Sequence, residues 1–113
     1  MEKCSEERPW GKFERFCHNQ KVTVKIISVK PNSRLSLQYH NKREEFWRVI
    51  SGSGQIVLGN KVIDVLEGDE FLIPIKTNHR IIAINHNLKI LEISFGNFDE
   101  DDIVRLEDDY SRI

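Results

Sequence analysis

The sequence lacks the features that would identify a membrane protein or a nucleic-acid-binding protein. None of its apolar runs approaches the ~20 residues needed to span a bilayer. Its first ten residues, MEKCSEERPW, are charged and precede no apolar segment, so they do not resemble a signal peptide. Lysine and arginine number 17 against 18 acidic residues, so there is no basic surplus to attract nucleic acid. We therefore expect a cytoplasmic protein that binds neither membranes nor nucleic acid.

Cysteine is scarce as well. Cys4 and Cys17 are the only two cysteines, and they form no CxxC pair. Two cysteines are too few for a disulfide framework, and their spacing is wrong for a zinc ribbon. We expect both thiols to be reduced, as is usual in the cytoplasm. The length of 113 residues allows one domain, residues 1–113, and not comfortably two.

The dominant pattern in the sequence is a period of two in short apolar segments. Turn-forming residues separate these segments: PNS at 31–33, SGSG at 51–54, GNK at 59–61 and EGD at 67–69. GNK lies between two strand-like runs and predicts a tight hairpin. Many short strands at this spacing are typical of an all-β sandwich or barrel. The one predicted helix is at the C-terminus, where the acidic run 99–102 precedes DIVRLED.

The segment SLQYHNKREEFW, residues 36–47, contains the first chemically unusual pattern. In a strand, Gln38 and His40 point to one face, because residues two apart share a face. Arg34 and Ser36 have the same parity, whereas Leu35, Leu37 and Tyr39 have the opposite one. A face with four polar residues faces either solvent or a polar cavity.

Two more residues complete a candidate metal site. If the next strand pairs with the first through the loop 41–44, Glu45 lies beside His40. His79, in PIKTNHR, begins a later strand. Two imidazoles, a carboxylate and an amide oxygen form a ligand set for a divalent first-row metal. Taken singly, each of these residues is more simply explained as a turn or strand residue, so the prediction depends on their combination.

The spacing of these residues resembles the two motifs of the cupin superfamily. His40, Glu45 and Gly52 match the first motif, with Gln38 in place of its first histidine, and Gly68, Pro74 and His79 match the second. Longer segments resemble the type II mannose-6-phosphate isomerase family, whose cupin domain is also fused to mannose-1-phosphate guanylyltransferases. These segments are RPWGKFERF, LSLQYHNKREEFWRVISG, IPIKTNHRI and DEDDIVRLEDDYSR, which together span most of residues 8–112.

The resemblance implies a small cupin barrel, also called a double-stranded β-helix or jelly roll. The barrel would occupy about residues 12–96, followed by a helical tail at about 99–109. The implied metal ligands are Gln38, His40, Glu45 and His79. They would bind one divalent ion, with zinc expected first and manganese, cobalt, nickel or iron also compatible. The resemblance further implies a homodimer. No nucleotidyltransferase segment precedes the domain, so we expect no synthesis of GDP-mannose.

The family reaction interconverts mannose 6-phosphate and fructose 6-phosphate through an enediol, so a sugar phosphate is the expected small-molecule partner. We predict Glu92 as the proton-transferring base, because it is a lone carboxylate in the apolar segment KILEIS. Arg43, on the family's motif arginine, and Arg34 are candidates for gripping phosphate. Ser36 and Trp47 are candidate substrate contacts, although core packing would explain Trp47 equally well.

A second hypothesis keeps the metal site without isomerase chemistry. Tyr39, Asn41, Lys42 and Phe46 stand in the region where the family has extra histidines. A cupin altered in this way could bind a sugar phosphate or sugar nucleotide without catalysing a reaction, because a fold does not fix a function.

Overall fold

The computed structural model describes residues 3–113, which form eleven β-strands and no helix. Their bounds are β1 Cys4–Arg8, β2 Gly11–Arg15, β3 Val22–Val29, β4 Ser33–Arg34, β5 Leu37–Tyr39, β6 Glu45–Leu58, β7 Lys61–Leu66, β8 Glu70–Ile73, β9 His79–Ala83, β10 Leu88–Phe95 and β11 Val104–Glu107. The all-β class expected from the period of two is confirmed. None of the described residues belongs to a helix long and apolar enough to cross a membrane.

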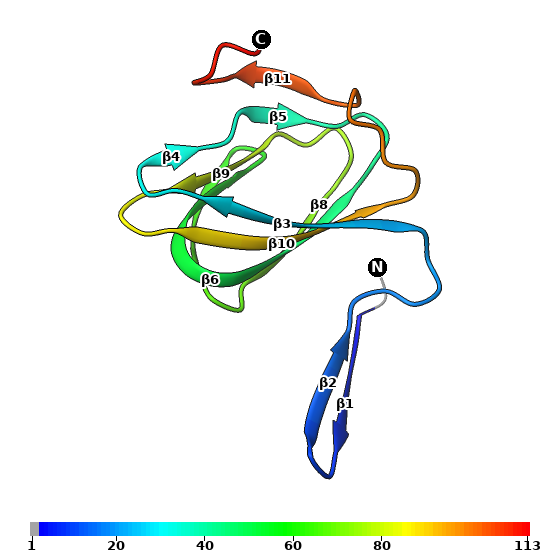
Figure 1. Ribbon diagram of the computed structural model, residues 1–113. Helices are drawn as coiled ribbons and strands as arrows, with labels where there is room; N and C mark the ends of the chain where they lie inside the picture. The colour runs from blue at the N-terminus through cyan, green and yellow to red at the C-terminus, as the bar shows by residue number, and fades with distance from the viewer. Residues whose placement is uncertain (1–2) are drawn as a thin grey trace.

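The long strand β6 connects the two faces of a curled barrel (Figure 1). Its first half pairs with β8 and β10, and β10 pairs in turn with β3. Its second half pairs with β7 and β9, and β9 continues through β5 to β11. All of these pairings are antiparallel, which is the arrangement expected of a cupin barrel.

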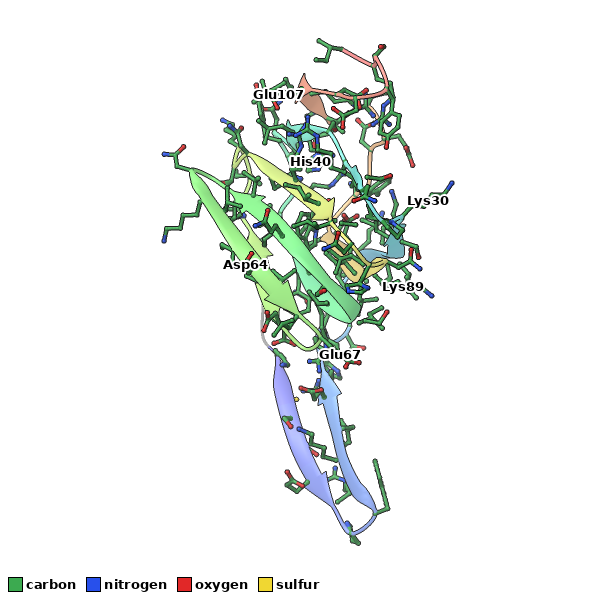
Figure 2. All side chains as sticks on the ribbon, turned by 90° about the vertical axis from the view of Figure 1, so that its left-hand side faces the viewer. Lys30, His40, Asp64, Glu67, Lys89 and Glu107 are labelled. Carbon is green, nitrogen blue, oxygen red and sulfur yellow. The ribbon has the colours of Figure 1, made fainter. Side chains whose placement is uncertain are left out.

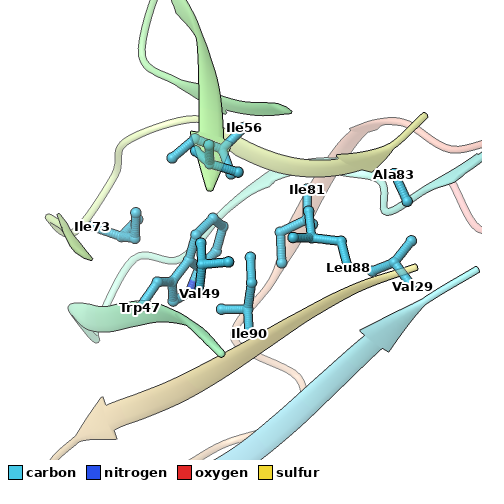
Figure 3. Close-up of a cluster of buried hydrophobic side chains, with 10 residues drawn as sticks. Val29, Trp47, Val49, Ile56, Ile73, Ile81, Ala83, Leu88 and Ile90 are labelled. Atoms are coloured by element: carbon cyan, nitrogen blue, oxygen red, sulfur yellow. The ribbon is translucent and has the colours of Figure 1, made fainter. Parts of the chain in front are cut away.

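The interior of the barrel is filled by branched side chains and one tryptophan (Figure 3). The buried cluster consists of Val29, Trp47, Val49, Ile56, Val65, Ile73, Ile81, Ala83, Leu88 and Ile90. Burying each large side chain contributes about 1.5–3 kcal/mol. Alternate residues of β6 supply Trp47 and Val49, so the same parity that fills the core also places Glu45 inside the barrel.

Three of the predicted turns are present, and the fourth is not a turn. Gly59 and Asn60 link β6 to β7 in a two-residue hairpin, with Leu58 opposite Lys61. The segment SGSG, in contrast, lies within β6, and the strand continues through it. Gly52 has a φ of +86°, and a Cβ built on it would lie 1.9 Å from the carbonyl oxygen of Asn87. The glycine therefore allows the strand to continue from one face of the barrel to the other.

The predicted C-terminal helix is wrong. Residues 104–107 form the edge strand β11, which pairs with β5. The acidic residues before it do not cap a helix. Instead, the carboxylate of Asp102 accepts hydrogen bonds from the backbone amides of Asn41 and Lys42. Pairing with an otherwise open strand, together with the β-branched Ile103 and Val104, outweighed the negative charge at the start of the segment.

Strands β1 and β2 form a separate two-stranded sheet that projects from the barrel (Figures 1 and 2). The sequence predicted that the barrel begins near residue 12. Residues 12–15 instead belong to the second strand of this hairpin.

Candidate metal centre

Three strands bring one carboxylate and two imidazoles together inside the barrel. His40 follows the last residue of β5, Glu45 is the first residue of β6, and His79 is the first residue of β9. All three side chains are at least 96% buried. Their candidate ligand atoms lie within 4.8 Å of one another, which makes the group suitable for holding a metal ion. The predicted return of Glu45 to the side of His40 is therefore present.

Backbone carbonyls orient both imidazoles. The Nδ1 atom of His40 lies 2.6 Å from the carbonyl oxygen of Asp102, and Nδ1 of His79 lies 2.8 Å from that of Thr77. A carbonyl can only accept a hydrogen bond, so each Nδ1 carries the proton and each Nε2 keeps its lone pair. The two Nε2 atoms lie 3.6 and 3.7 Å from oxygens of Glu45. Metal-binding histidines are usually oriented in this way.

One oxygen of the Glu45 carboxylate lies next to the imidazoles and accepts no hydrogen bond from the described residues. Its Oε2 atom accepts hydrogen bonds from Nε of Arg43 at 3.1 Å and from Oγ of Ser94 at 3.3 Å. Its Oε1 atom is buried and has no hydrogen-bond partner among the described residues. A buried acceptor without a partner is costly unless another group satisfies it. Oε1, next to two imidazole lone pairs, therefore fits a divalent cation.

Gln38 is the fourth ligand that the resemblance implies, and this role stays a prediction. It lies directly opposite His79 in the β5–β9 pairing. Its Nε2 atom donates a hydrogen bond to Oγ of Ser36 at 3.0 Å, which leaves the amide oxygen available. Gln38, His40 and His79 line one cavity, and Glu45 lies beside both histidines, so the four predicted ligands are close to one another.

Burial keeps both histidines neutral. It lowers the pKa of the His40 imidazole and the pKa of the His79 imidazole below the usual value, and the nearby charge of Glu45 only partly opposes the effect. A metal ligand must be the neutral imidazole, so burial favours the binding form.

Three of the four metal-ligand candidates, Gln38, His40 and His79, line a cavity of about 220 Å³. Its walls carry four cationic side chains, Lys25, Arg43, Arg80 and Arg105. Two of these side chains, Arg43 and Arg80, are held by contacts within the protein. The Arg43 guanidinium lies 3.1 Å from the Asp99 carbonyl and 4.5 Å from the centre of the Phe98 ring, and Arg80 bonds to Glu107 at 3.0 Å. Two glutamates, Glu92 and Glu100, also line the cavity, so the cationic side chains are in excess and favour an anionic ligand.

Arg105 lines the cavity but was not predicted as a site residue. It lies opposite Gln38 in the β11–β5 pairing. Its Nε atom is buried and has no hydrogen-bond partner in the described part of the chain. A helix was predicted here, so the direction of its side chain could not be worked out. In the sequence, Arg105 stands between the apolar residues Val104 and Leu106. This alternation is typical of a strand and could have indicated that Arg105 points to one face.

Glu92, predicted from the sequence as the base, is a buried residue of the cavity wall. It is 7% exposed, lines the cavity and faces Trp47 across the β10–β6 pairing. Burial and the neighbouring charge of Glu45 raise the pKa of Glu92 to about 7. Trp47 belongs to the core cluster and also lines the cavity, so core packing is observed and the substrate contact stays a prediction.

Two predicted substrate contacts are not among the residues that line the cavity. Arg34 lies on the surface, where it forms hydrogen bonds of 2.8 and 2.9 Å with Asp109. Ser36 is buried behind Gln38 and contacts its amide. The alternation from which both were predicted is interrupted, because β4 ends at Arg34 and β5 begins only at Leu37. Leu35, expected on the opposite face, lines the cavity instead.

Comparison with known proteins identifies the family of this chain. The family model described as mannose-6-phosphate isomerase C-terminal matches residues 2–108. The alginate biosynthesis protein AlgA of Pseudomonas aeruginosa is 40% identical over 111 residues, which are 96% of this chain and 23% of that protein. This chain thus spans about a quarter of the length of such curated relatives.

Solved structures show the same fold. A cupin 2 conserved barrel protein from Rhodopseudomonas palustris matches with a TM-score of 0.67 and 24% identity, over 76% of this chain and 60% of that one. A putative sugar phosphate isomerase from Acidithiobacillus ferrooxidans matches with a TM-score of 0.61 and 23% identity, over 67% and 51%. The barrel, the motif residues and the family match agree: this chain is a cupin and belongs to the mannose-6-phosphate isomerase C-terminal family.

Proposed function

We propose that this chain is a metal-dependent aldose–ketose isomerase that interconverts mannose 6-phosphate and fructose 6-phosphate. The observation that carries the proposal is the presence, in one cavity, of a buried carboxylate with a pKa of about 7, a metal-ligand group and a cationic wall. Isomerisation needs a base, an electrophile and a phosphate grip, and each of these has a candidate here.

Glu92 is the proposed base. A proton must leave C2 of the aldose and reach C1 of the ketose, so one group must both accept and return it. A carboxylate with a pKa near the working pH performs both steps well. Glu45 is less suited, because its charge is directed toward the two histidines and Arg43.

Gln38, His40, Glu45 and His79 would hold the metal. When bound, a divalent ion supplies Lewis-acid stabilisation of negative charge on the sugar oxygens. The protein's contribution is to keep both imidazoles neutral, with Nε2 directed inward, and to place the Glu45 carboxylate between them.

Arg105 is the proposed phosphate-binding residue. Arg43 and Arg80 already bond to protein acceptors, whereas the Nε atom of Arg105 has none in the described residues. An arginine without an anionic partner, at the wall of a cavity, can grip a phosphate with two parallel hydrogen bonds.

The cytoplasmic location expected from the sequence remains a prediction.

A coupled assay tests the proposal. The protein is chelated, reloaded separately with zinc, manganese, cobalt or nickel, and assayed for fructose 6-phosphate formed from mannose 6-phosphate. We expect turnover with at least one metal and a loss of about 10²–10⁴-fold in kcat for Glu92→Gln with its metal retained. Absence of turnover with all four metals would contradict the isomerase. If calorimetry then still detected binding of mannose 6-phosphate, the non-catalytic binding hypothesis would replace it.

A further inference from the structure

Three side chains of the cavity wall form one row across neighbouring strands. Strands β3, β10 and β6 lie side by side in the sheet (Figure 1). Glu92 of β10 is paired with Lys25 of β3 on one side and with Trp47 of β6 on the other. Directly opposed residues point to the same face, with their Cβ atoms about 4.5–5.5 Å apart. All three line the cavity, so a cation stands directly beside the proposed base.

The alternation along β3 explains why this lysine points inward. Val24 and Ile26 are more than half exposed on the outer face, whereas Ile27 packs against the core and lines the cavity together with Lys25. A lysine can pack its apolar stem along such a wall while its charged end stays in contact with water. The Lys25 side chain is 41% exposed. Its ammonium is therefore accessible to a ligand that enters the cavity.

The Lys25 ammonium is oriented by contacts that do not use its N–H groups. It lies 4.2 Å from the centre of the Phe98 ring, in a cation–π contact. Its ion pair with Glu100 is 3.9 Å long, beyond hydrogen-bond distance, and Glu100 is 82% exposed to water. A lysine carries three N–H donors. Lys25 can therefore donate to a ligand, whereas Arg43 and Arg80 already bond to protein acceptors.

Lys25 and the candidate metal ligand Glu45 lie on opposite sides of Glu92. Ser94, two residues further along β10, is paired with Glu45 of β6 and donates a hydrogen bond to its carboxylate. Glu45 thus lies on the β6 side of β10, and Lys25 lies on the β3 side. Burial and the charge of Glu45 raise the pKa of Glu92, whereas the charge of Lys25 opposes that rise. The protein's own cation can therefore stabilise negative charge beside Glu92 from the β3 side.

We infer that Lys25 is a further catalytic residue, which donates a hydrogen bond to the sugar oxygen that becomes negative when Glu92 removes a proton from the sugar. In the aldose, the C2–H bond breaks, its electron pair forms the C1–C2 double bond, and the carbonyl electrons move to O1. Glu92 then returns its proton to C1 and the hydroxyl proton of O2 passes to O1, so the atoms balance and Lys25 keeps its protons. A donor already aimed at the place where charge develops lowers the barrier. The inference rests on the proposed isomerase function and extends it.

Steady-state kinetics of Lys25→Met in the metal-loaded protein test the inference. We expect kcat to fall about 30–100-fold while KM for mannose 6-phosphate stays nearly unchanged, because the negative charge exists only in the transition state. Lys25→Arg keeps a cation and should retain a larger share of kcat than Lys25→Met. Lys30→Met is the matched control, since Lys30 is exposed directly after β3 and is not among the residues that line the cavity. Its kcat should equal that of the wild type.

Two further readouts separate this role from a structural one. Methylammonium added to Lys25→Ala should restore kcat in a saturable manner, because the free cation can occupy the place of the missing ammonium. Calorimetry with arabinonohydroxamic acid 5-phosphate, whose planar hydroxamate resembles the enediolate, should show a dissociation constant raised about 30–100-fold in Lys25→Met. A loss of kcat with no rescue and an unchanged affinity for the hydroxamate would overturn the inference.

The outcomes for Lys25 and for the isomerase are distinguishable. An active wild type with equal kcat values in Lys25→Met and Lys30→Met would overturn the role of Lys25 and leave the isomerase standing. A raised KM with unchanged kcat in Lys25→Met would overturn it as well, since Lys25 would then only bind substrate. Absence of turnover in the wild type would contradict the isomerase and, with it, the part given to Lys25.

Discussion

At the scale of single residues, the site depends on which polar atoms are left without a partner. The sequence alone does not distinguish Arg34 from Arg105. In the structure, Arg34 forms a hydrogen bond with Asp109 on the surface, whereas Arg105 lies at the cavity wall. Glu45 has one oxygen fully bonded and one free. Composition and spacing in the sequence identify candidate residues. Whether a candidate can bind a ligand depends on whether its polar atoms already form hydrogen bonds within the protein.

Arg105→Met tests the phosphate grip. If Arg105 binds the phosphate, KM for mannose 6-phosphate should rise about 10–100-fold, as expected when a charge-assisted hydrogen bond to substrate is lost. Arg34→Met is the matched control, since its guanidinium lies outside the cavity. Steady-state kinetics should show an unchanged KM for that variant. Equal KM values in all three proteins would contradict the role given to Arg105.

Glu92→Gln tests the raised pKa through stability in the chelated protein. The pKa of Glu92 is about 7 in the folded state and near 4.5 when unfolded, so folding favours the protonated form. The wild type should therefore lose stability relative to Glu92→Gln as pH rises from about 4.5 to 7, by on the order of 3 kcal/mol. The histidines occur in both proteins and cancel in the difference. Urea unfolding at pH 5 and 8 measures it, and a pH-independent difference would contradict the assignment.

At the scale of elements, the C-terminal tail contacts the candidate metal centre. Asp102 accepts the amides of Asn41 and Lys42, and its carbonyl oxygen orients His40. We expect Asp102→Ala to lower the free energy of unfolding by about 1–3 kcal/mol and to weaken metal binding about 10–100-fold. Chemical denaturation and metal titration measure the two effects. The exposed Asp101→Ala should change neither, and a comparable loss in that control would show that the tail does not act through Asp102.

The continuity of β6 depends on Gly52. Its φ of +86° disfavours other residues, and an added Cβ would overlap the Asn87 carbonyl. Gly52→Ala should therefore destabilise the protein by more than about 3 kcal/mol. Gly59→Ala, also at positive φ but in open space, should cost only about 1 kcal/mol. Thermal unfolding compares them, and similar losses would contradict the steric argument.

How far the sequence could predict each element depends on how local its determinants are. The parity of Glu45, Trp47 and Val49 was predictable, because the first half of β6 alternates regularly. The break after Arg34 was not, since it depends on β4 and β5 forming separate pairings with β9. The tail resembled a helix by its local charge, and only the open edge of β5 makes it a strand. The four metal-ligand candidates were predictable because their motif spacing reflects the order of strands in the barrel.

At the scale of the whole molecule, the two ends of the barrel carry different features. Strands β5 and β11, which contribute walls of the cavity, lie at the end opposite the hairpin (Figures 1 and 2). The cavity end carries the buried metal-ligand group, and the hairpin end carries the exposed Trp10. The cavity and the exposed Trp10 therefore lie toward opposite ends of the molecule.

The central claim is that His40, Glu45 and His79, with Gln38, hold one divalent ion, and metal stoichiometry tests it most directly. Elemental analysis after reloading and desalting should find close to one ion per chain in the wild type. His86→Ala, which changes an exposed histidine in a turn, should retain it. His40→Ala should lose the ion, because it removes one of three converging ligand atoms. An undiminished stoichiometry in His40→Ala would contradict the metal centre itself.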